Sequence, residues 1–371
     1  MKDNSKKIDY VLIILTFILV LLGFFVLSTT SAPLSLKKFG QPYYYLQHQL
    51  FFGLIPGIIF GILFFKIPLN FLKKISPYLL FANLILTSFV FLPHIGLKFG
   101  GAKRWISIGD FVFQPSEFLK ISFILYLAYW LSARFSRKPI IRKERLLNEN
   151  LVAFIVIIGL ISILLISQPD ITTLGIIVLV GFLMYFIIGS PLWHTILFFF
   201  AGLIGLLFLS KTASYRIKRW TIFLNPEVDP LGIGYQLKQA TIAIGSGGIL
   251  GVGLGMSRQK FGFLPHSISD SIFAIFAEES GLIGGIILVA LFLIFAWRGF
   301  IIAKNTADRF SQLVAVGITS WIFLQFFVNV GAMIGVLPLV GIPLPLISYG
   351  GSHLVCELIG IGILLNISRN K

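Results

Sequence analysis

The residues with the most chemical potential are ionisable side chains inside, or at the mouth of, long apolar runs. A charged group in the bilayer core is costly, so each one is a hypothesis of function by default. They are Glu117, Lys120, Glu278, Glu279, Glu357 and Asp270. Carboxylates and amines of this kind pair, bind ions or move protons, and these positions therefore direct the search for a site.

Two spacings predict side-chain pairs on one helix face. Glu117 and Lys120 are three residues apart, and His353 and Glu357 are four apart. The first pair fits either an ion pair that fixes helix packing or a contact with substrate in an outer cavity. The second fits a shared hydrogen bond or a shared metal ion, although two ligands are too few for a metal site by themselves.

Glu278 and Glu279 are consecutive, so they do not share one helix face. At most one of them is expected to line a cavity. A packing or capping role for the pair stands beside a functional one.

Asp270 differs from the other carboxylates because it lies where a long polar segment enters an apolar run. The helix dipole favours a carboxylate at a helix N-terminus, so one interpretation is an N-cap. The other is a base held at the boundary between lipid and water. Basic residues on the same side include Lys103, Arg104 and Arg219. A base beside cations suits a transfer in which a phosphate or diphosphate leaves, although each basic and aromatic cluster taken singly is also typical of interfacial anchoring.

The composition requires a membrane. Of 371 residues, 57% are hydrophobic and 12% are charged, whereas soluble domains carry roughly 25% charged residues. The formal net charge of +16 lies in short loops between apolar runs, which favours a topological role over nucleic-acid binding. The single Cys356 excludes an internal disulfide, and no Cys/His cluster predicts zinc. The first apolar run is too long for a signal peptide and is expected to remain as a span.

Ten apolar stretches are long enough to cross about 30 Å of hydrocarbon. They lie at about 9–28, 46–65, 76–93, 115–133, 151–168, 171–188, 192–210, 271–297, 309–333 and 352–368. We therefore predict an all-α polytopic bundle that forms one integral membrane domain over 1–371. Pro115 and Ser116 suit the start of the fourth helix.

The basic residues predict the orientation of this bundle. With the N-terminus inside, the inner segments hold 17 of the 30 Lys and Arg residues and the short outer loops hold 5. This bias predicts that both termini are cytoplasmic.

Two segments expected outside the membrane, 94–114 and 211–270, are too long to be plain connectors, and loops of such length are usually functional. The second contains glycine-rich pieces at 243–248 and 251–255. They fit either a phosphate-cradling loop or glycines that let short re-entrant or amphipathic helices pack closely. The strand and helix context of a dinucleotide or phosphate loop is lacking, which favours close packing.

Many short motifs occur in an order that resembles the SEDS family (shape, elongation, division and sporulation), the relatives of FtsW, RodA and SpoVE. They are GGAKRWI at 100–106, FQPSE at 113–117, QPD at 168–170, RW at 219–220, LNP at 224–226, DP at 229–230, GYQL at 234–237, IAIGSGG at 242–248, SRQK at 257–260, FLP at 263–265, DSIF at 270–273, GIPLP at 341–345 and SYGGS at 348–352. The SRQK piece resembles the FtsW-like division and sporulation branch more than the RodA branch.

The resemblance implies a peptidoglycan glycosyltransferase that polymerises lipid II on the outer face of the bacterial cytoplasmic membrane. Asp270 matches the essential aspartate of the family, as a general base or as the ligand of a divalent cation such as Mg²⁺. The matching motifs give the expected substrate-binding residues, which are Lys103, Arg104, Glu117, Lys120, Arg219, Gln236, Arg258, Lys260, Ser348 and Ser352. Implied partners are a class B penicillin-binding protein and other divisome or elongasome membrane proteins.

Two residues depart from the family pattern. His266 stands where a glutamate is usual, and His353 stands where a second serine is common. Either change is expected to alter rate, pH dependence or cation use while Asp270 is kept.

Two other classes of function remain open. A helical bundle with buried charges fits a flippase that carries lipid II across the bilayer, and a non-catalytic scaffold for a penicillin-binding protein would not need Asp270. A flippase needs a polar path to the inner face, whereas Glu117, Lys120 and Asp270 are predicted near the outer half.

Overall fold

The computed structural model describes residues 8–99, 102–109, 111–135, 143–189, 193–194, 196–198, 200, 202, 205, 214–225, 228–229 and 232–369. Most of the expected span 192–210 lies outside these residues. So do Gly100, Gly101, Pro226 and Pro230 of the sequence motifs.

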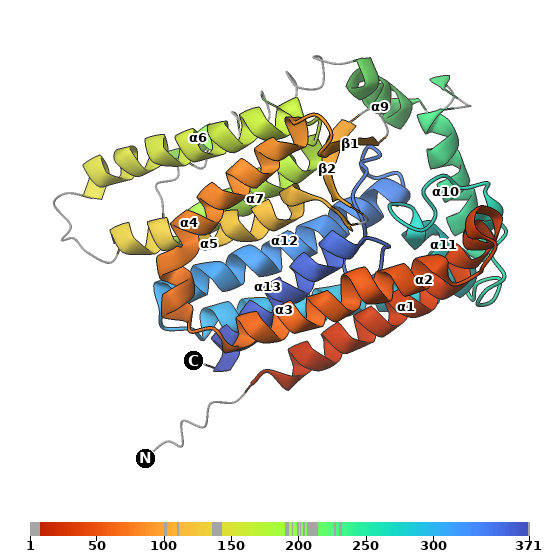
Figure 1. The fold of residues 1–371 in the computed structure, drawn as a ribbon, viewed down its shortest axis with the longest axis horizontal. Coiled ribbons are helices and arrows are strands. Elements are labelled where there is room, and N and C mark those ends of the chain that lie inside the picture. The colour runs from red at the N-terminus through yellow and green to blue at the C-terminus, as the bar shows by residue number, and fades with distance from the viewer. Residues whose placement is uncertain are drawn as a thin grey trace.

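The described chain is a bundle of long helices with a small sheet at one end (Figure 1). The helices before the sheet are α1 (Tyr10–Phe39), α2 (Tyr44–Gln49), the π-helical turn η1 (Leu50–Leu54), α3 (Ile55–Lys66), α4 (Leu69–Ser88) and the 3₁₀ turn η2 (Phe89–Phe91). After the sheet come α5 (Pro115–Phe135), α6 (Lys143–Ser167), α7 (Ile171–Ile187), α9 (Ser214–Leu224), α10 (Ile233–Gly247), the 3₁₀ turn η5 (Gln259–Phe261), α11 (Ile272–Lys304), α12 (Arg309–Met333) and α13 (Gly351–Arg369).

Helix ends follow local signals in the sequence. Asp9 caps α1 because its carboxylate accepts the Leu12 N–H at 3.1 Å, and Gly40 ends the helix in the left-handed conformation (φ 71°). Asp308 caps α12 in the same way through the Ser311 N–H at 2.9 Å. The start of α5 at Pro115 agrees with the sequence prediction.

The membrane character of the chain is confirmed. Among the described residues, six helices are long and apolar enough to cross a membrane, and shorter apolar helices lie at Leu151–Ser167 and Ile171–Ile187. Nine of the ten expected spans correspond to helices, several of which run beyond their apolar stretch. For example, α1 continues for 11 residues past the predicted end at 28 because polar residues extend the helix beyond the apolar part.

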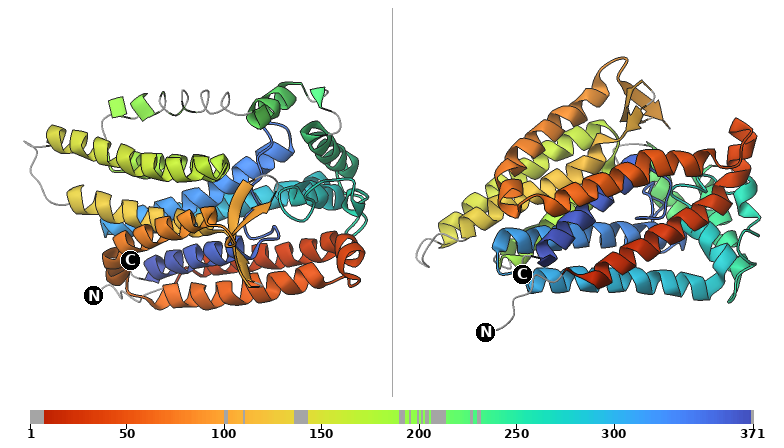
Figure 2. Two further views of the ribbon diagram at one scale, coloured as in Figure 1. Left: turned by 45° about the horizontal axis from the view of Figure 1, so that its top comes forward. Right: turned by 60° about the horizontal axis from the view of Figure 1, so that its bottom comes forward.

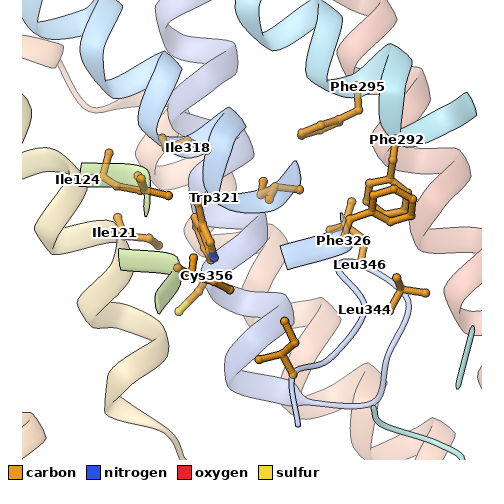
Figure 3. Packing of buried hydrophobic residues seen from close by; sticks show 14 of the residues in the cluster. Ile121, Ile124, Phe292, Phe295, Ile318, Trp321, Phe326, Leu344, Leu346 and Cys356 are labelled. Carbon is orange, nitrogen blue, oxygen red and sulfur yellow. The ribbon is translucent and has the colours of Figure 1, made fainter. Parts of the chain in front are cut away.

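Helices α12 and α13 form the centre of the bundle. In their most apolar stretches 78% and 83% of residues are buried, against 22% in the helix Tyr44–Lys66 that packs on α13. Small residues allow this close contact, since a Cβ added to Gly362 on α13 would lie 2.2 Å from the Gly61 carbonyl oxygen on α3. Figure 3 shows the apolar interior, with Trp321 between the helices and stacked Phe292 and Phe326.

The segment 94–114, expected only to be a long outer loop, contains an antiparallel sheet. Its strands are β1 (Gly96–Phe99), β2 (Ala102–Ile108) and β3 (Phe111–Phe113), in the order β1-β2-β3. A register shift between Leu97 and Lys98 places Lys98 opposite Lys103. The sheet leads directly into α5 and is a minor part of an otherwise helical fold.

The two ends of the described chain meet at one end of the bundle. The backbone N–H of Asp9 donates to the Ser368 hydroxyl at 3.2 Å, and the Asp9 carboxylate forms an ion pair with Arg298 at 2.5 Å. The sheet, α9 and α10 lie toward the opposite end (Figures 1 and 2). The elements with unusual polar motifs are therefore separated from the chain ends by the length of the bundle.

Candidate active site

Asp270 lies immediately before α11, but it does not cap that helix. The N-cap position belongs to Ser271, and no side-chain cap hydrogen bond is present there. The N-cap interpretation of Asp270 is therefore wrong. The chain turns tightly before this residue, because the N–H groups of Ser269 and Ser271 both donate to the His266 carbonyl at 3.1 Å. The Asp270 carboxylate therefore does not cap the first turn of α11.

The backbone around Asp270 is fixed by three successive carbonyl groups. The carbonyl of Ile268 accepts the Tyr349 N–H at 2.9 Å, that of Ser269 accepts the Ser348 hydroxyl at 2.5 Å, and that of Asp270 accepts the Asn329 side-chain amide at 2.8 Å. Buried carbonyl groups need such donors, and here distant elements supply them. Segment 265–271 is called the aspartate loop below.

The segment between α12 and α13 packs against the aspartate loop. Asn329 also donates to the Ile342 carbonyl at 2.7 Å, so one amide joins the two segments. The Ser348 hydroxyl accepts the Leu344 N–H at 2.8 Å while it donates to Ser269. Segment 341–349 is called the supporting loop below. The aspartate loop is thus held by residues 59 and 79 positions later in the chain.

Basic side chains act electrostatically on the Asp270 carboxylate. Burial raises the pKa of Asp270, and electrostatic interactions with His266, Arg219, Arg104 and His353 act to lower it. Burial has the larger effect, and the pKa is raised above its ordinary value. Such a carboxylate is a stronger proton acceptor than an exposed aspartate, and the cations beside it suit a ligand with negative charge.

Arg104 connects the sheet to the turn before α7. Its Nε atom donates to the Gln168 carbonyl at 3.3 Å, its Nη2 atom donates to the Pro169 carbonyl, and its Nη1 atom lies 3.8 Å from Asp170. Asp170 also accepts a hydrogen bond from Ser116 at the start of α5, at 2.9 Å. Arg104 is therefore oriented by protein groups while its charge reaches Asp270.

A buried polar network lies below this surface between α5, α12 and α13. Glu117 and Lys120 form an ion pair at 2.8 Å, which confirms the pairing expected from their spacing. Lys120 also donates to the Gln325 side-chain oxygen at 3.0 Å and lies 4.9 Å above the Trp321 ring. Both charged side chains are almost fully buried. Their charges are balanced within the bundle interior.

His353 joins the same network from α13. Its Nδ1 atom lies 3.1 Å from Glu117 and its Nε2 atom lies 3.0 Å from Glu357. The expected contact between His353 and Glu357 is confirmed. Gln325 reaches from the network to the supporting loop, since its amide donates to the Pro343 carbonyl at 3.2 Å.

The carboxylates of Glu278 and Glu279 both bind groups of one loop, 255–260. Glu278 accepts hydrogen bonds from the Ser257 hydroxyl and from the Arg258 N–H at 3.1 Å. Glu279 accepts the Ser257 N–H at 3.3 Å and forms an ion pair with Lys260 at 3.1 Å. Of the roles considered from the sequence, the packing role fits both carboxylates.

The glycine-rich segment 247–253 packs into a break in α11. Gly281 has φ 68° and ψ −167°, which interrupts the helix. The Val252 and Gly253 N–H groups donate to the carbonyls of Glu278 and Glu279 at 3.0 and 3.2 Å. In return, the Leu282 N–H donates to the Gly248 carbonyl at 2.9 Å. The glycines thus allow the close packing that the sequence favoured over a phosphate loop.

Comparison with known proteins then identifies the family. The family of cell cycle proteins named for FtsW, RodA and SpoVE matches residues 9–371. The chain belongs to this family. It is 37% identical to the stage V sporulation protein E of Bacillus subtilis, over 100% of this chain and 99% of that protein. It is 36% identical to a probable peptidoglycan glycosyltransferase FtsW of Trichlorobacter lovleyi, over 97% of this chain and 93% of that protein.

Solved structures share the fold of this FtsW, RodA and SpoVE family member. One chain, from work described as the structural coordination of polymerization and crosslinking by a peptidoglycan synthase complex, superposes with a TM-score of 0.75 at 26% identity and 98% coverage of both chains. The rod shape determining protein RodA of Thermus thermophilus gives 0.69 at 26% identity, over 98% of this chain and 97% of that one.

The substrate-binding residues expected from the family motifs divide into two groups. Lys103 and Arg258 are exposed, and Arg104 and Arg219 are partly exposed near the aspartate loop. Lys260 is instead buried in its ion pair with Glu279, which neutralises its charge within the protein. Among the expected substrate-binding residues, Lys103, Arg104, Arg219 and Arg258 are the cations with accessible surface.

The polar residues expected to bind substrate hold the backbone. Ser348 binds the aspartate loop, Gln236 on α10 donates to the Ser271 hydroxyl at 3.0 Å, and Ser352 accepts the Gln114 N–H at 3.1 Å. The sequence did not predict Asn329 or Gln325 as site residues. Each is an amide side chain within the mainly apolar run 309–333, and this feature could have indicated a role for it. Both are buried in the structure.

A divalent cation at Asp270 finds few protein ligands. Among the described residues no group of three His, Cys, Asp or Glu side chains is arranged for a metal ion. The charged groups that act on Asp270 are cationic, which opposes a metal held by the protein. Within the described part of the chain, the side chains around Asp270 do not fit a cation site of their own.

Proposed function

We propose that this protein is a glycosyltransferase that polymerises lipid II into glycan strands, with Asp270 as the general base. The FtsW relatives, that of Trichlorobacter lovleyi among them, are named probable peptidoglycan glycosyltransferases. The observation that carries the proposal is the Asp270 carboxylate, which is fixed by its neighbours through the backbone and flanked by Arg104 and Arg219. The whole of 1–371 acts as one integral membrane domain.

This arrangement supports the following chemistry. Asp270 takes the proton of the 4-hydroxyl group of the acceptor N-acetylglucosamine. The acceptor oxygen forms a bond to the anomeric carbon of the donor muramyl unit from the face opposite the diphosphate. The bond from that carbon to the diphosphate oxygen breaks with inversion, and the electron pair leaves with undecaprenyl diphosphate.

The accessible cations favour departure of the diphosphate. Negative charge develops on the phosphate oxygens as the bond breaks, and Arg104 and Arg219 lie close enough to act on the same carboxylate. Positive groups held in place before the reaction stabilise such charge without reorganisation. Arg104 is held by the Gln168 and Pro169 carbonyls, which is the kind of orientation this role needs.

The membrane fold supports a proposal for the position of the protein in the cell. We place the protein in the bacterial cytoplasmic membrane, with both termini cytoplasmic and Asp270 on the outer side, at the division septum. Both chain ends meet at one end of the bundle. The segments that the sequence predicts on the same side as the N-terminus hold 17 of the 30 Lys and Arg residues, which is typical of the cytoplasmic side. Its partner is a class B penicillin-binding protein, in keeping with the peptidoglycan synthase complex that shares the fold.

Polymerisation of purified lipid II by the reconstituted protein tests the function. The experiment compares wild type with Asp270→Asn, each with and without a class B penicillin-binding protein. A suitable control is Asp308→Asn, because Asp308 caps α12 and asparagine is an equally good cap. We expect glycan chains from wild type and the control and a loss of at least about 100-fold in Asp270→Asn, as for removal of a general base.

The alternatives give different results. A flippase would keep lipid II translocation in Asp270→Asn, and a scaffold would make no glycan in any variant while it still bound the partner. Normal polymerisation by Asp270→Asn would contradict the role of Asp270 as a base.

A further inference from the structure

His353 and Glu357 connect the buried network to the supporting loop. One Glu357 oxygen lies 3.0 Å from His353 Nε2, and the other accepts the backbone N–H of Leu346 at 2.8 Å. Glu357 is fully buried on α13. This carboxylate therefore interacts with a side chain of its own helix and with the supporting loop.

The backbone of Leu346 is in an uncommon conformation, and its buried N–H group needs an acceptor. Its φ of 61° lies in the left-handed region, which is unfavourable for a residue other than glycine. Leu346 is buried, so its N–H group cannot bond to water. Glu357 supplies the acceptor and stabilises the turn in this form.

His353 balances the charge of Glu357 in the bundle interior. Its two ring nitrogens face carboxylate oxygens of Glu117 and Glu357 at 3.1 and 3.0 Å. Nδ1 is hydrogen-bonded to Glu117 and Nε2 lies at ion-pair distance from Glu357, so a ring protonated on both nitrogens matches the charges of both carboxylates. Lys120 pairs with Glu117, so a protonated His353 brings the network to two cations and two anions.

The supporting loop carries this restraint to Asp270. Ser348 is two residues after Leu346 and binds the Ser269 carbonyl, and the Tyr349 N–H binds the Ile268 carbonyl. At the other end of the loop, Gly341 packs against the Asp270 carboxylate. Both ends of the supporting loop therefore meet the aspartate loop.

We propose that His353 and Glu357 form a positioning pair for Asp270. The pair fixes the left-handed turn at Leu346, and through it the supporting loop holds the carboxylate in place. The proposal rests on the proposed function for its effect on rate. Neither residue touches the reacting groups, so the pair acts on the rate of the reaction and not on substrate binding.

Kinetics of Glu357 variants test the positioning role. Glu357→Ala removes the Leu346 acceptor, and we expect kcat for lipid II polymerisation to fall about 10- to 100-fold, as for misplacement of a reacting group by about 1 Å. KM is expected to stay within about twofold, because uniform binding is unchanged. Glu357→Gln keeps an oxygen for the Leu346 N–H and is expected to recover most of the rate. A rise in KM with unchanged kcat would overturn the proposal.

A double variant separates positioning from stability. His353→Ser alone leaves Glu357 without its neighbouring cation, which is strongly destabilising for a buried carboxylate. His353→Ser combined with Glu357→Met removes both charges, and we expect the thermal stability to recover while kcat stays low. Recovery of both quantities would mean that the pair contributes only to folding, against the proposal.

Asp9→Asn is the matched control. It weakens another buried ion pair, that of Asp9 with Arg298 at the chain ends, far from the supporting loop. We expect lower thermal stability with an unchanged kcat. If Glu357→Ala lowers kcat no more than Asp9→Asn does, the positioning proposal is wrong.

Hydrogen exchange provides a readout that does not depend on activity. In Glu357→Ala the amides of Leu346 and Tyr349 are expected to exchange faster than in wild type or Asp9→Asn, because their restraint is lost. Unchanged exchange in 341–349 would contradict the proposal. If the wild type makes no glycan while the exchange result holds, the proposed function fails and the positioning of Asp270 stands.

Discussion

Gly341 lies directly against the carboxylate of Asp270. A Cβ atom on Gly341 would be 3.1 Å from Asp270 Oδ2, which is closer than most real Cβ contacts. Glycine at this position therefore leaves room for the carboxylate in its present orientation. The contact couples the start of the supporting loop to the proposed base.

Substitution of Gly341 is expected to impair catalysis without unfolding the protein. In Gly341→Ala the carboxylate must move by a few tenths of an ångström, and we expect kcat to fall by up to about tenfold with KM unchanged. Gly350→Ala is the control, because its Cβ would meet the nearest atom at an ordinary 3.5 Å. Polymerisation rates and melting temperatures measure both. Wild-type activity in Gly341→Ala would show that the orientation of Asp270 tolerates the shift.

The pH dependence of polymerisation reports on Asp270. A base must be ionised, so activity falls as pH drops through the pKa of Asp270, which burial raises above the ordinary value of about 3.9. Arg219 lowers this pKa, and Arg219→Gln is expected to move the acid limb of the pH profile of kcat/KM to higher pH. An acid limb that stays in place would assign it to another group.

The same shift affects the stability of the fold. The pKa of Asp270 is higher in the folded than in the unfolded state, so its contribution to stability is complete below the unfolded pKa and is lost as pH rises through the folded one. At neutral pH the ionised carboxylate therefore destabilises the protein. We expect Asp270→Asn to raise the melting temperature at neutral pH, with a smaller difference in acid.

Much of the helical architecture was readable from the sequence because lipid requires long apolar helices. The expected span 309–333 coincides with α12 (Arg309–Met333). Helix ends outside the apolar stretch were less accessible, as α1 shows by continuing to Phe39. The sheet at 96–113 was not predicted, since its strands are short and one pairs Lys98 with Lys103.

The candidate site was readable in its residue types and less so in their contacts. Asp270 and Arg104 were predicted from their chemistry and from the family motifs. In the structure they are near enough for the charge of Arg104 to lower the pKa of Asp270. Sequence did not reveal that Lys260 is taken up by Glu279, since that contact depends on the path of loop 255–260. Asn329 was missed for the same reason, because its partners Asp270 and Ile342 meet only in the folded chain.

Lys260 and Arg258 are expected to respond differently to the loss of their charge. Lys260→Met leaves Glu279 as an uncompensated buried carboxylate, which costs about 3–5 kcal/mol of stability. Arg258→Met removes an exposed cation, and we expect unchanged stability with a higher KM for lipid II. Thermal unfolding in detergent and polymerisation kinetics distinguish the two. Equal loss of stability in both variants would contradict this division of the SRQK motif.

The break in α11 gives a last prediction about glycine. Gly281 and Gly251 face each other with positive φ angles of 68° and 84°, and a Cβ on Gly281 would lie 2.3 Å from the Gly251 nitrogen. Alanine at either position is both strained and blocked by backbone, so we expect a loss of about 2 kcal/mol or more for Gly281→Ala and Gly251→Ala.

The matched control for these two variants lies on the same helix. Gly285 is also in α11, where a Cβ would meet no atom within 4 Å, and Gly285→Ala is expected to be neutral or slightly stabilising because alanine favours helix. Melting temperatures measured side by side decide the matter. If Gly281→Ala is as stable as Gly285→Ala, α11 does not need the break, and the hydrogen bonds from Val252 and Gly253 to the carbonyls of Glu278 and Glu279 are dispensable.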